Sequence, residues 1–217
     1  MSQKKTGGNG AVGVSIGAPN MRVAEFKIIG DAVLVIHRFS QKVKLEMLRK
    51  MEAGKASACK KVREPKDADR LYEEARYVSK DGWEGFHAAS LRCAMIDCCR
   101  LVSFKMTLAK MSVFTLSDGL DAIEPQIPLV RIYGKSIRQD DMARVETGQP
   151  YVTVRAAYHN WYAKPRIRWD ADQFALADVT NLLARVGAQC GIGEGRPNSK
   201  NSCGMGWGLF HIAGDGE

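Results

Sequence analysis

The sequence has no uninterrupted apolar run close to the roughly 18 residues that a membrane-spanning helix needs. Its first 20 residues contain two lysines but no continuous apolar segment, so we expect no secretory signal there. These absences predict a cytoplasmic protein without a membrane partner. Residues 1–21 are expected to form a flexible glycine-rich tail, and residues 214–217 a second, shorter tail.

Spacings typical of metal and redox sites are also missing. The chain has six cysteines but no C-x-x-C pair, and no pair of Cys or His has zinc-finger spacing. Cys93 and Cys98 lie in an apolar helical pattern, where a free cysteine behaves as a small hydrophobe. We therefore expect reduced structural thiols, no metal and no cofactor.

Residues 191–208 include six glycines among 18 residues, yet the common phosphate-binding motifs are absent. Lys200 follows Ser199, whereas a P-loop lysine follows glycine. The glycines are spaced G-x-G-x-G, whereas a dinucleotide fingerprint needs G-x-G-x-x-G at the start of a helix. This loop instead follows a predicted helix and precedes a predicted strand, so mononucleotide and dinucleotide binding are not expected.

Positive charge is concentrated in one part of the chain. The net charge is +8 and the isoelectric point is about 9.2. Residues 38–80 contain 13 Lys and Arg against seven Asp and Glu, a net +6. Such a block favours a nucleic-acid partner, because neutralised phosphates supply most sequence-independent affinity. A solvated, lysine-rich helical face is the alternative.

The hydrophobic pattern predicts a single α+β domain over residues 22–213. Residues 23–39 form one bulged strand or two strands, and helices are expected at 86–102 and 178–187. Strands follow at 110–119, 127–134, 151–170 and 206–213. Without a basic insertion at 40–84 and a smaller one at 134–150, this order is a ferredoxin-like (RRM/RAMP-type) βαββαβ core. The glycine-rich loop precedes its last strand.

Residues 151–170 alternate with a period of two, as a half-buried strand does. Arg155, His159 and Trp161 share one face of the first half, and Arg166 and Arg168 share a face beyond Ala163. The exposed face is thus predicted to be basic and aromatic, a composition typical of single-strand-binding surfaces. An ordinary solvated sheet face is the alternative.

The segment GIGEGRP…GMGWGLF resembles the glycine-rich loop of the RAMP superfamily, in the form found in backbone subunits of CRISPR interference complexes. The chain is also similar to phage proteins related to those RNA-coating subunits. The shared motifs are HRFS (His37 to Ser40), GF-x-A (Gly85 to Ala88) and GIGE-x-RP (Gly191 to Pro197). The resemblance covers residues 22–212.

This resemblance implies a phage protein in the host bacterial cytoplasm that binds RNA or single-stranded DNA. Protomers would assemble head to tail into a helical filament, with the two insertions clamping the nucleic-acid backbone. A role in coating or annealing DNA during recombination stays open. So does a role as an inhibitor or decoy of host CRISPR complexes, acting by binding CRISPR RNA or a protein subunit.

A metal-independent endoribonuclease is a further alternative, because relatives in the superfamily cleave RNA with a histidine as general acid or base. His37, His87, His159 and His211 are the only candidates. The sequence has no acidic cluster for two-metal chemistry, which favours a binding protein over an enzyme.

The predicted nucleic-acid contacts come from the basic insertion, the first helix, the alternating strands and the glycine-rich loop. Arg196 either contacts the ligand or holds the shape of the loop. The full set is Arg38, Lys42, Lys44, Arg49, Lys50, Arg92, Arg155, His159, Trp161, Arg166, Arg168, Arg196 and Lys200. No catalytic, cofactor-binding or metal-ligating residue is assigned.

Overall fold

The computed structural model describes residues 16–53, 67–144, 150–199 and 205–214 of the chain. These residues form α-helices and several antiparallel sheets, so the predicted α+β class is confirmed. The strands are β1 (Met21–Glu25), β2 (Ile28–Gly30), β3 (Leu34–Ile36), β4 (Tyr77–Val78), β5 (Glu84–His87), β6 (Val113–Leu116), β7 (Gly119–Leu120), β8 (Pro128–Tyr133), β9 (Ile137–Arg144), β10 (Pro150–Tyr158), β11 (Tyr162–Ala163), β12 (Arg166–Asp170) and β13 (Phe210–Ile212). The helices are α1 (Gln41–Ala53), α2 (Ala68–Ala75), α3 (Ala88–Cys98), α4 (Met106–Ser112) and α5 (Leu176–Arg185), with a 3-10 turn η2 (Cys99–Val102) and a π turn η3 (Val186–Cys190).

The strands are arranged in three antiparallel sheets. The central sheet has the order β13-β2-β11-β8-β5-β4, with β7 also paired to β8. A second sheet has the order β1-β12-β6, and a third has the order β3-β10-β9. The first two meet where β1 passes into β2 and β11 into β12, and there the Phe26 N–H donates to the Pro165 carbonyl at 3.0 Å. The chain from 21 to 30 and from 162 to 170 therefore crosses both sheets.

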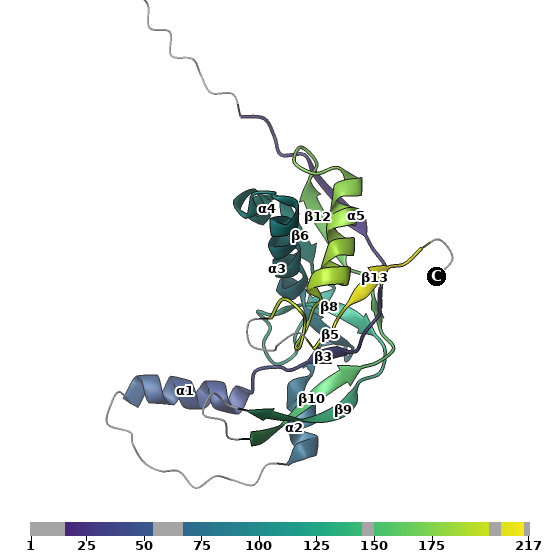
Figure 1. The fold of residues 1–217 in the computed structure, drawn as a ribbon. Helices are drawn as coiled ribbons and strands as arrows, with labels where there is room; N and C mark the ends of the chain where they lie inside the picture. The colour runs from purple at the N-terminus through teal and green to yellow at the C-terminus, as the bar shows by residue number, and fades with distance from the viewer. Residues whose placement is uncertain (1–15, 54–66, 145–149, 200–204, 215–217) are drawn as a thin grey trace, which may run out of the picture.

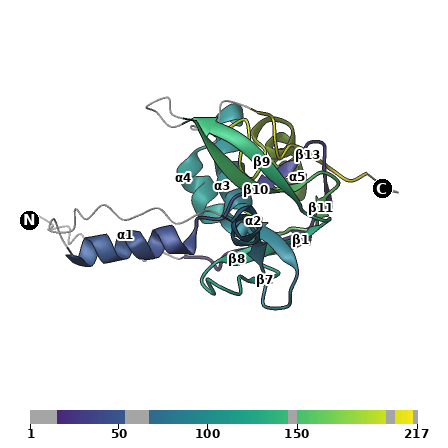
Figure 2. The same ribbon diagram turned by 90° about the horizontal axis from the view of Figure 1, so that it is seen from below.

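The larger helices cover one side of these strands. α3 packs against β5, β6 and β8, and α5 packs against β13 and α3. Leu91, Met95, Val179 and Leu183 are fully buried there with Ile167 of β12. Figure 1 shows α3, α4 and α5 together on this side. In Figure 2, seen from below, β8, β7 and β1 lie on the side turned away from α3 and α5.

Two predicted boundaries are wrong. Val102 was expected on the buried face of the first helix, but its side chain is exposed because α3 tightens into η2 and ends at Ser103, which has φ of 55°. The strand expected at 110–119 begins only at Val113, because residues 106–112 form α4 and bury Ala109 against the core. In both places a change of helical geometry breaks the period on which the prediction relied.

The insertion at 40–84 contains two different parts. α1 projects from the rest of the molecule (Figures 1 and 2), and its apolar side chains Leu45, Met47 and Met51 are exposed. α2, in contrast, packs against β10. The smaller insertion pairs with β10 through β9, forming a long hairpin. Residues 54–66 and 145–149 of the insertions, and 1–15 and 215–217 of the predicted tails, lie outside the described residues.

Candidate nucleic-acid interface

The first half of the predicted exposed face is buried. Residues 153–158 of β10 are inaccessible on both faces, because α2 packs on this strand and the glycine-rich loop lies beside it. Arg155 is only 9% exposed and donates to Asp141 (3.0 Å) and Glu194 (2.7 Å). The Trp161 indole is buried too, and its Nε1–H donates to the Ala32 carbonyl at 2.9 Å. The prediction of solvent-facing Arg155 and Trp161 is therefore wrong.

Arg38, like Arg155, is buried and paired with carboxylates. Its guanidinium is buried and donates to Asp121 at 2.7 Å and to Glu124 at 3.4 Å, and it lies over the Tyr77 ring. Lys44 also bonds Glu124. A buried guanidinium that already has carboxylate partners holds the protein together and leaves little charge for a phosphate. These bonds fix the base of α1 to the loop before β8.

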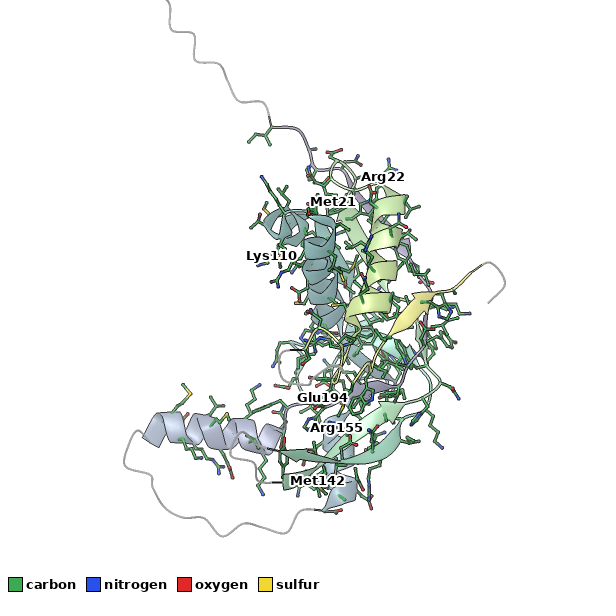
Figure 3. All side chains as sticks on the ribbon, viewed as in Figure 1. Met21, Arg22, Lys110, Met142, Arg155 and Glu194 are labelled. Carbon is green, nitrogen blue, oxygen red and sulfur yellow. The ribbon has the colours of Figure 1, made fainter. Side chains whose placement is uncertain are left out.

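Arg155 belongs to a network that joins two motifs of the resemblance. His37 Nδ1, from HRFS, lies 3.3 Å from Oε2 of Glu194, from the glycine-rich loop, and the other oxygen of Glu194 accepts from Arg155. Burial raises the pKa of Glu194, but hydrogen bonds from His37 and Arg155 outweigh it and hold this pKa at about 2. Figure 3 shows Arg155 and Glu194 next to each other between the β9–β10 hairpin and the body.

Several N–H groups in the described part of the glycine-rich loop donate to carbonyl groups of the protein. Ile192 donates to the Gly208 carbonyl, Glu194 to Val35 and Gly208 to Val33. Arg196 donates to the Gly193 carbonyl at 2.9 Å, which holds the shape of the loop. These N–H groups are therefore not available to cradle a phosphate. The predicted contact Lys200 lies outside the described residues.

The predicted contacts on α1 are separate from the sheets. Lys42, Arg49 and Lys50 are exposed on the projecting helix. His159 is also exposed, in the bend between β10 and β11. None of these four lies on a strand.

The second half of the alternating segment matches its prediction. Ile167 and Trp169 are buried, while Arg168 is exposed on the opposite face. The guanidiniums of Arg168 and Arg92 lie over the same Phe114 ring, at 4.9 and 4.8 Å. Arg92 also donates to the Val113 carbonyl at 2.9 Å. Arg166 donates to the Ser117 carbonyl at 2.8 Å and lies 3.6 Å from Asp118.

A row of rings and cations continues this face across β11 and β8. The rings of Tyr162 and Tyr133, directly opposite each other on paired strands, stack with centroids 4.6 Å apart and planes 4° from parallel. Arg131 lies over Tyr133 at 4.9 Å and over Trp83 at 6.0 Å, and Lys27 lies over Tyr162 at 5.5 Å. We call this set the cation–aromatic ladder: Trp83, Arg131, Tyr133, Tyr162 and Lys27.

Two glycines make room for the ladder. A Cβ at Gly85 would lie 3.0 Å from the Trp83 ring, and one at Gly119 would lie 2.7 Å from it. Next to the ladder is a depression of about 600 Å³, lined in part by Lys135 and Asn160. Rings that lie flat on a sheet beside cations are the arrangement that a single-strand-binding surface needs.

The cations of this side differ from Arg38 and Arg155. Within the described residues, no carboxylate forms an ion pair with Arg131, Lys135, Lys164 or Arg168. We call these four the open cations; together with the ladder they define the helix-free face. Sequence reasoning missed most of it. The available signal was the alternation of exposed Arg131 and half-buried Tyr133 with buried Val130 and Ile132 in β8.

The histidines are placed in three kinds of surroundings. His87 Nδ1 accepts from the Ala89 N–H at the start of α3, and burial lowers its pKa. His211 lies 2.6 Å from Asp31, and His37 contacts Glu194. The four described cysteines, Cys93, Cys98, Cys99 and Cys190, are free thiols. Cys59 and Cys203 lie outside the described residues.

No family model matches the sequence, and no curated protein matches it either. Among the described residues, no group of three or more His, Cys, Asp or Glu side chains is placed to hold a metal ion. No helix in the same ranges is long and apolar enough to cross a bilayer.

Proposed function

We propose that this protein binds single-stranded RNA or DNA along the helix-free face. The observation that carries the proposal is the cation–aromatic ladder next to open cations on the side of the sheet that α3 and α5 leave uncovered. Arg168 and Lys164 supply charge for phosphates, and Arg131 and Lys135 lie beside the rings of the ladder. The rings of the ladder supply surfaces on which bases pack. A duplex keeps its bases stacked on one another, so single strands fit this face better.

As part of the same proposal, we assign the central strands to a ferredoxin-like core. The order β13-β2-β11-β8, antiparallel throughout, is the order that a βαββαβ chain takes in such a sheet, with α3 and α5 as its helices. This order supports the resemblance to RAMP proteins, and RRM-type sheets bind RNA on their uncovered face. Head-to-tail assembly belongs to the same proposal, supported by the exposed apolar side chains of projecting α1.

The test is a charge reversal with a matched control. Lys164→Glu with Arg168→Glu changes the charge by four units on the helix-free face. Arg49→Glu with Lys50→Glu makes the same change on α1, which projects from the rest of the molecule. We expect the first variant to bind a labelled 12-mer at least about ten-fold more weakly. Its plot of log K against log salt should be shallower by about 1.4, since each lost contact on a single strand removes about 0.7.

The control variant should bind within about two-fold of the wild type, because at moderate salt the Debye length is about 10 Å. Both variants should keep the circular dichroism of the wild type, since all four side chains are exposed. Equal weakening by both variants would show that net charge alone attracts the strand. Unchanged binding by the first variant would remove the helix-free face as the binding surface.

A further inference from the structure

The depression beside the ladder has features that phosphate binding alone does not explain. Its volume of about 600 Å³ lies within the range of ligand pockets. Its walls include the rings of Trp83, Tyr133 and Tyr162. Phosphates on a strand need cations on an open surface, whereas a hollow with aromatic walls suits a flat, aromatic group. A nucleobase is such a group.

Arg131 lines this depression, and its side-chain N–H donors have no partner among the described residues. Its guanidinium lies over Tyr133 and Trp83, which hold its plane. Arg76 and Arg138, in contrast, donate to carboxylates. No described residue accepts a hydrogen bond from the Arg131 side chain. A planar guanidinium that is held in place by rings, with N–H donors that no described residue accepts, suits a ligand with two adjacent hydrogen-bond acceptors.

Glu84 and Ser136 also line the space, but Glu84 accepts hydrogen bonds from Ser136 and Arg76, and two other polar groups are left to face a ligand. Lys135 is exposed and lines the depression from the turn after β8, and Asn160 lines it from the bend before β11. These two segments are packed closely, because a Cβ on Gly134 would lie 2.6 Å from the Asn160 carbonyl oxygen. An amide side chain both donates and accepts, so Asn160 can accept from an amino group while the cations donate.

On the basis of the proposed function, we infer that the depression takes one base of the bound strand and selects guanine. Guanine carries two neighbouring acceptors, O6 and N7, which match the donors of Arg131 and Lys135. Its N1–H and amino group match the Asn160 oxygen. Adenine places an amino group where guanine has O6, and the pyrimidines have no N7. The two-ring base also covers more of the aromatic wall.

The test compares four labelled RNA 12-mers, U throughout except for a central G, A, C or U. We expect the G-containing strand to bind about ten-fold more tightly than the others, the discrimination typical of one bidentate contact. Arg131→Lys is the informative variant because it keeps the charge and removes the planar fork. It should remove the preference for G while changing the affinity for the all-U strand by less than about two-fold. Asn160→Ala should weaken only the G strand.

The outcomes separate this inference from the function on which it rests. Similar affinity of the wild type for all four strands would overturn guanine selection and leave strand binding intact. Equal weakening of all four strands by Arg131→Lys would also overturn it, because Arg131 would then be a phosphate contact. Failure of every strand to bind would overturn the proposed function itself.

Discussion

Arginine has two roles in this chain, and the surroundings of each guanidinium decide which one it has. Arg38 and Arg155 are buried on carboxylates, where they join segments that are far apart in the sequence. Removing one partner of such a pair leaves an uncompensated buried charge and is strongly destabilising. Arg131 and Arg168 instead contact rings, with their N–H edges unpaired by carboxylates. Only the second kind can bind a phosphate or a base without first breaking the fold.

Acid should weaken the network around Glu194. The folded-state pKa of Glu194, about 2, lies below the ordinary value of 4.5, so its contribution is complete above pH 4.5 and is lost as the pH falls towards 2. We expect Glu194→Gln to lower the free energy of unfolding near neutral pH by on the order of 2 kcal/mol. The difference from the wild type should shrink across this acidic window, measured by urea unfolding.

The control for this prediction is Glu52→Gln, on the exposed surface of α1. It should follow the wild-type curve at every pH. The difference in unfolding free energy between Glu194→Gln and the wild type could instead be the same at pH 3 and pH 7. That result would contradict the ionic role of Glu194 and would indicate a loss of packing only.

At the scale of elements, the glycine-rich loop is a place where segments of backbone pack closely against one another. Gly191, Gly193, Gly195, Gly206 and Gly208 all have φ between 68° and 79°, a region that costs other residues about 1–2 kcal/mol. The chain passes from α5 through a π turn, in which Gly187 lies against the Phe210 carbonyl. The loop thus brings Glu194 to β3 and β10, and its glycines serve the fold.

Two glycines of this loop provide a matched pair of substitutions. A Cβ at Gly208 would lie 1.8 Å from the Ile192 carbonyl oxygen, whereas one at Gly206 would have no atom of the described residues within 4 Å. Their φ values, 70° and 72°, are nearly equal. We expect Gly206→Ala to lose about 1 kcal/mol of unfolding free energy through backbone strain alone. Gly208→Ala should lose more than about 3 kcal/mol or fail to fold, because the clash is with backbone.

Urea unfolding of the two variants measures the difference. Equal losses would mean that backbone conformation is the only demand on the loop and that the close approach of residues 192 and 208 can relax. A larger loss in Gly206→Ala would contradict the geometry described for both positions.

At the scale of the whole molecule, the distribution of charge is more informative than its total. Residues 38–80 carry much of the net +8, yet Arg38, Lys44, Arg70 and Arg76 in that range are paired with carboxylates. The open cations lie at 131–168 instead. The basic block therefore contributes ion pairs to the fold as well as exposed charge on α1, and the net charge alone does not locate the binding surface.

Two phosphate contacts, by Lys164 and Arg168, predict how binding depends on salt. The slope of log K against log salt should be about −1.4 for single strands, since each contact contributes about 0.7. An anisotropy titration of single-stranded RNA, single-stranded DNA and duplex DNA at several lengths measures this slope. We expect duplex to bind more weakly, and affinity per site to rise with strand length if protomers assemble. A slope near zero would contradict phosphate binding on this face.

The local pattern of the chain was enough to predict much of the secondary structure. The periodic apolar positions of α3 and α5 and the alternation of Ile167 and Trp169 with Arg166 and Arg168 indicated helices and a strand with the correct buried sides, because these periods depend only on neighbouring residues. The α+β class followed from their order. The same logic failed at Arg155 and Trp161, because both faces of β10 are covered by segments distant in the chain.

The candidate site depended on tertiary structure to a greater degree. Composition and charge pointed to nucleic acid, and Arg166 and Arg168 were found from alternation alone. Arg131 and Tyr133 lie on β8, Tyr162 lies on β11, and Trp83 lies directly before β5. Only the pairing of β5, β8 and β11 brings these side chains into one row. Whether an arginine meets a carboxylate or a ring is likewise decided by contacts across the chain, since the two kinds of arginine look alike in the sequence.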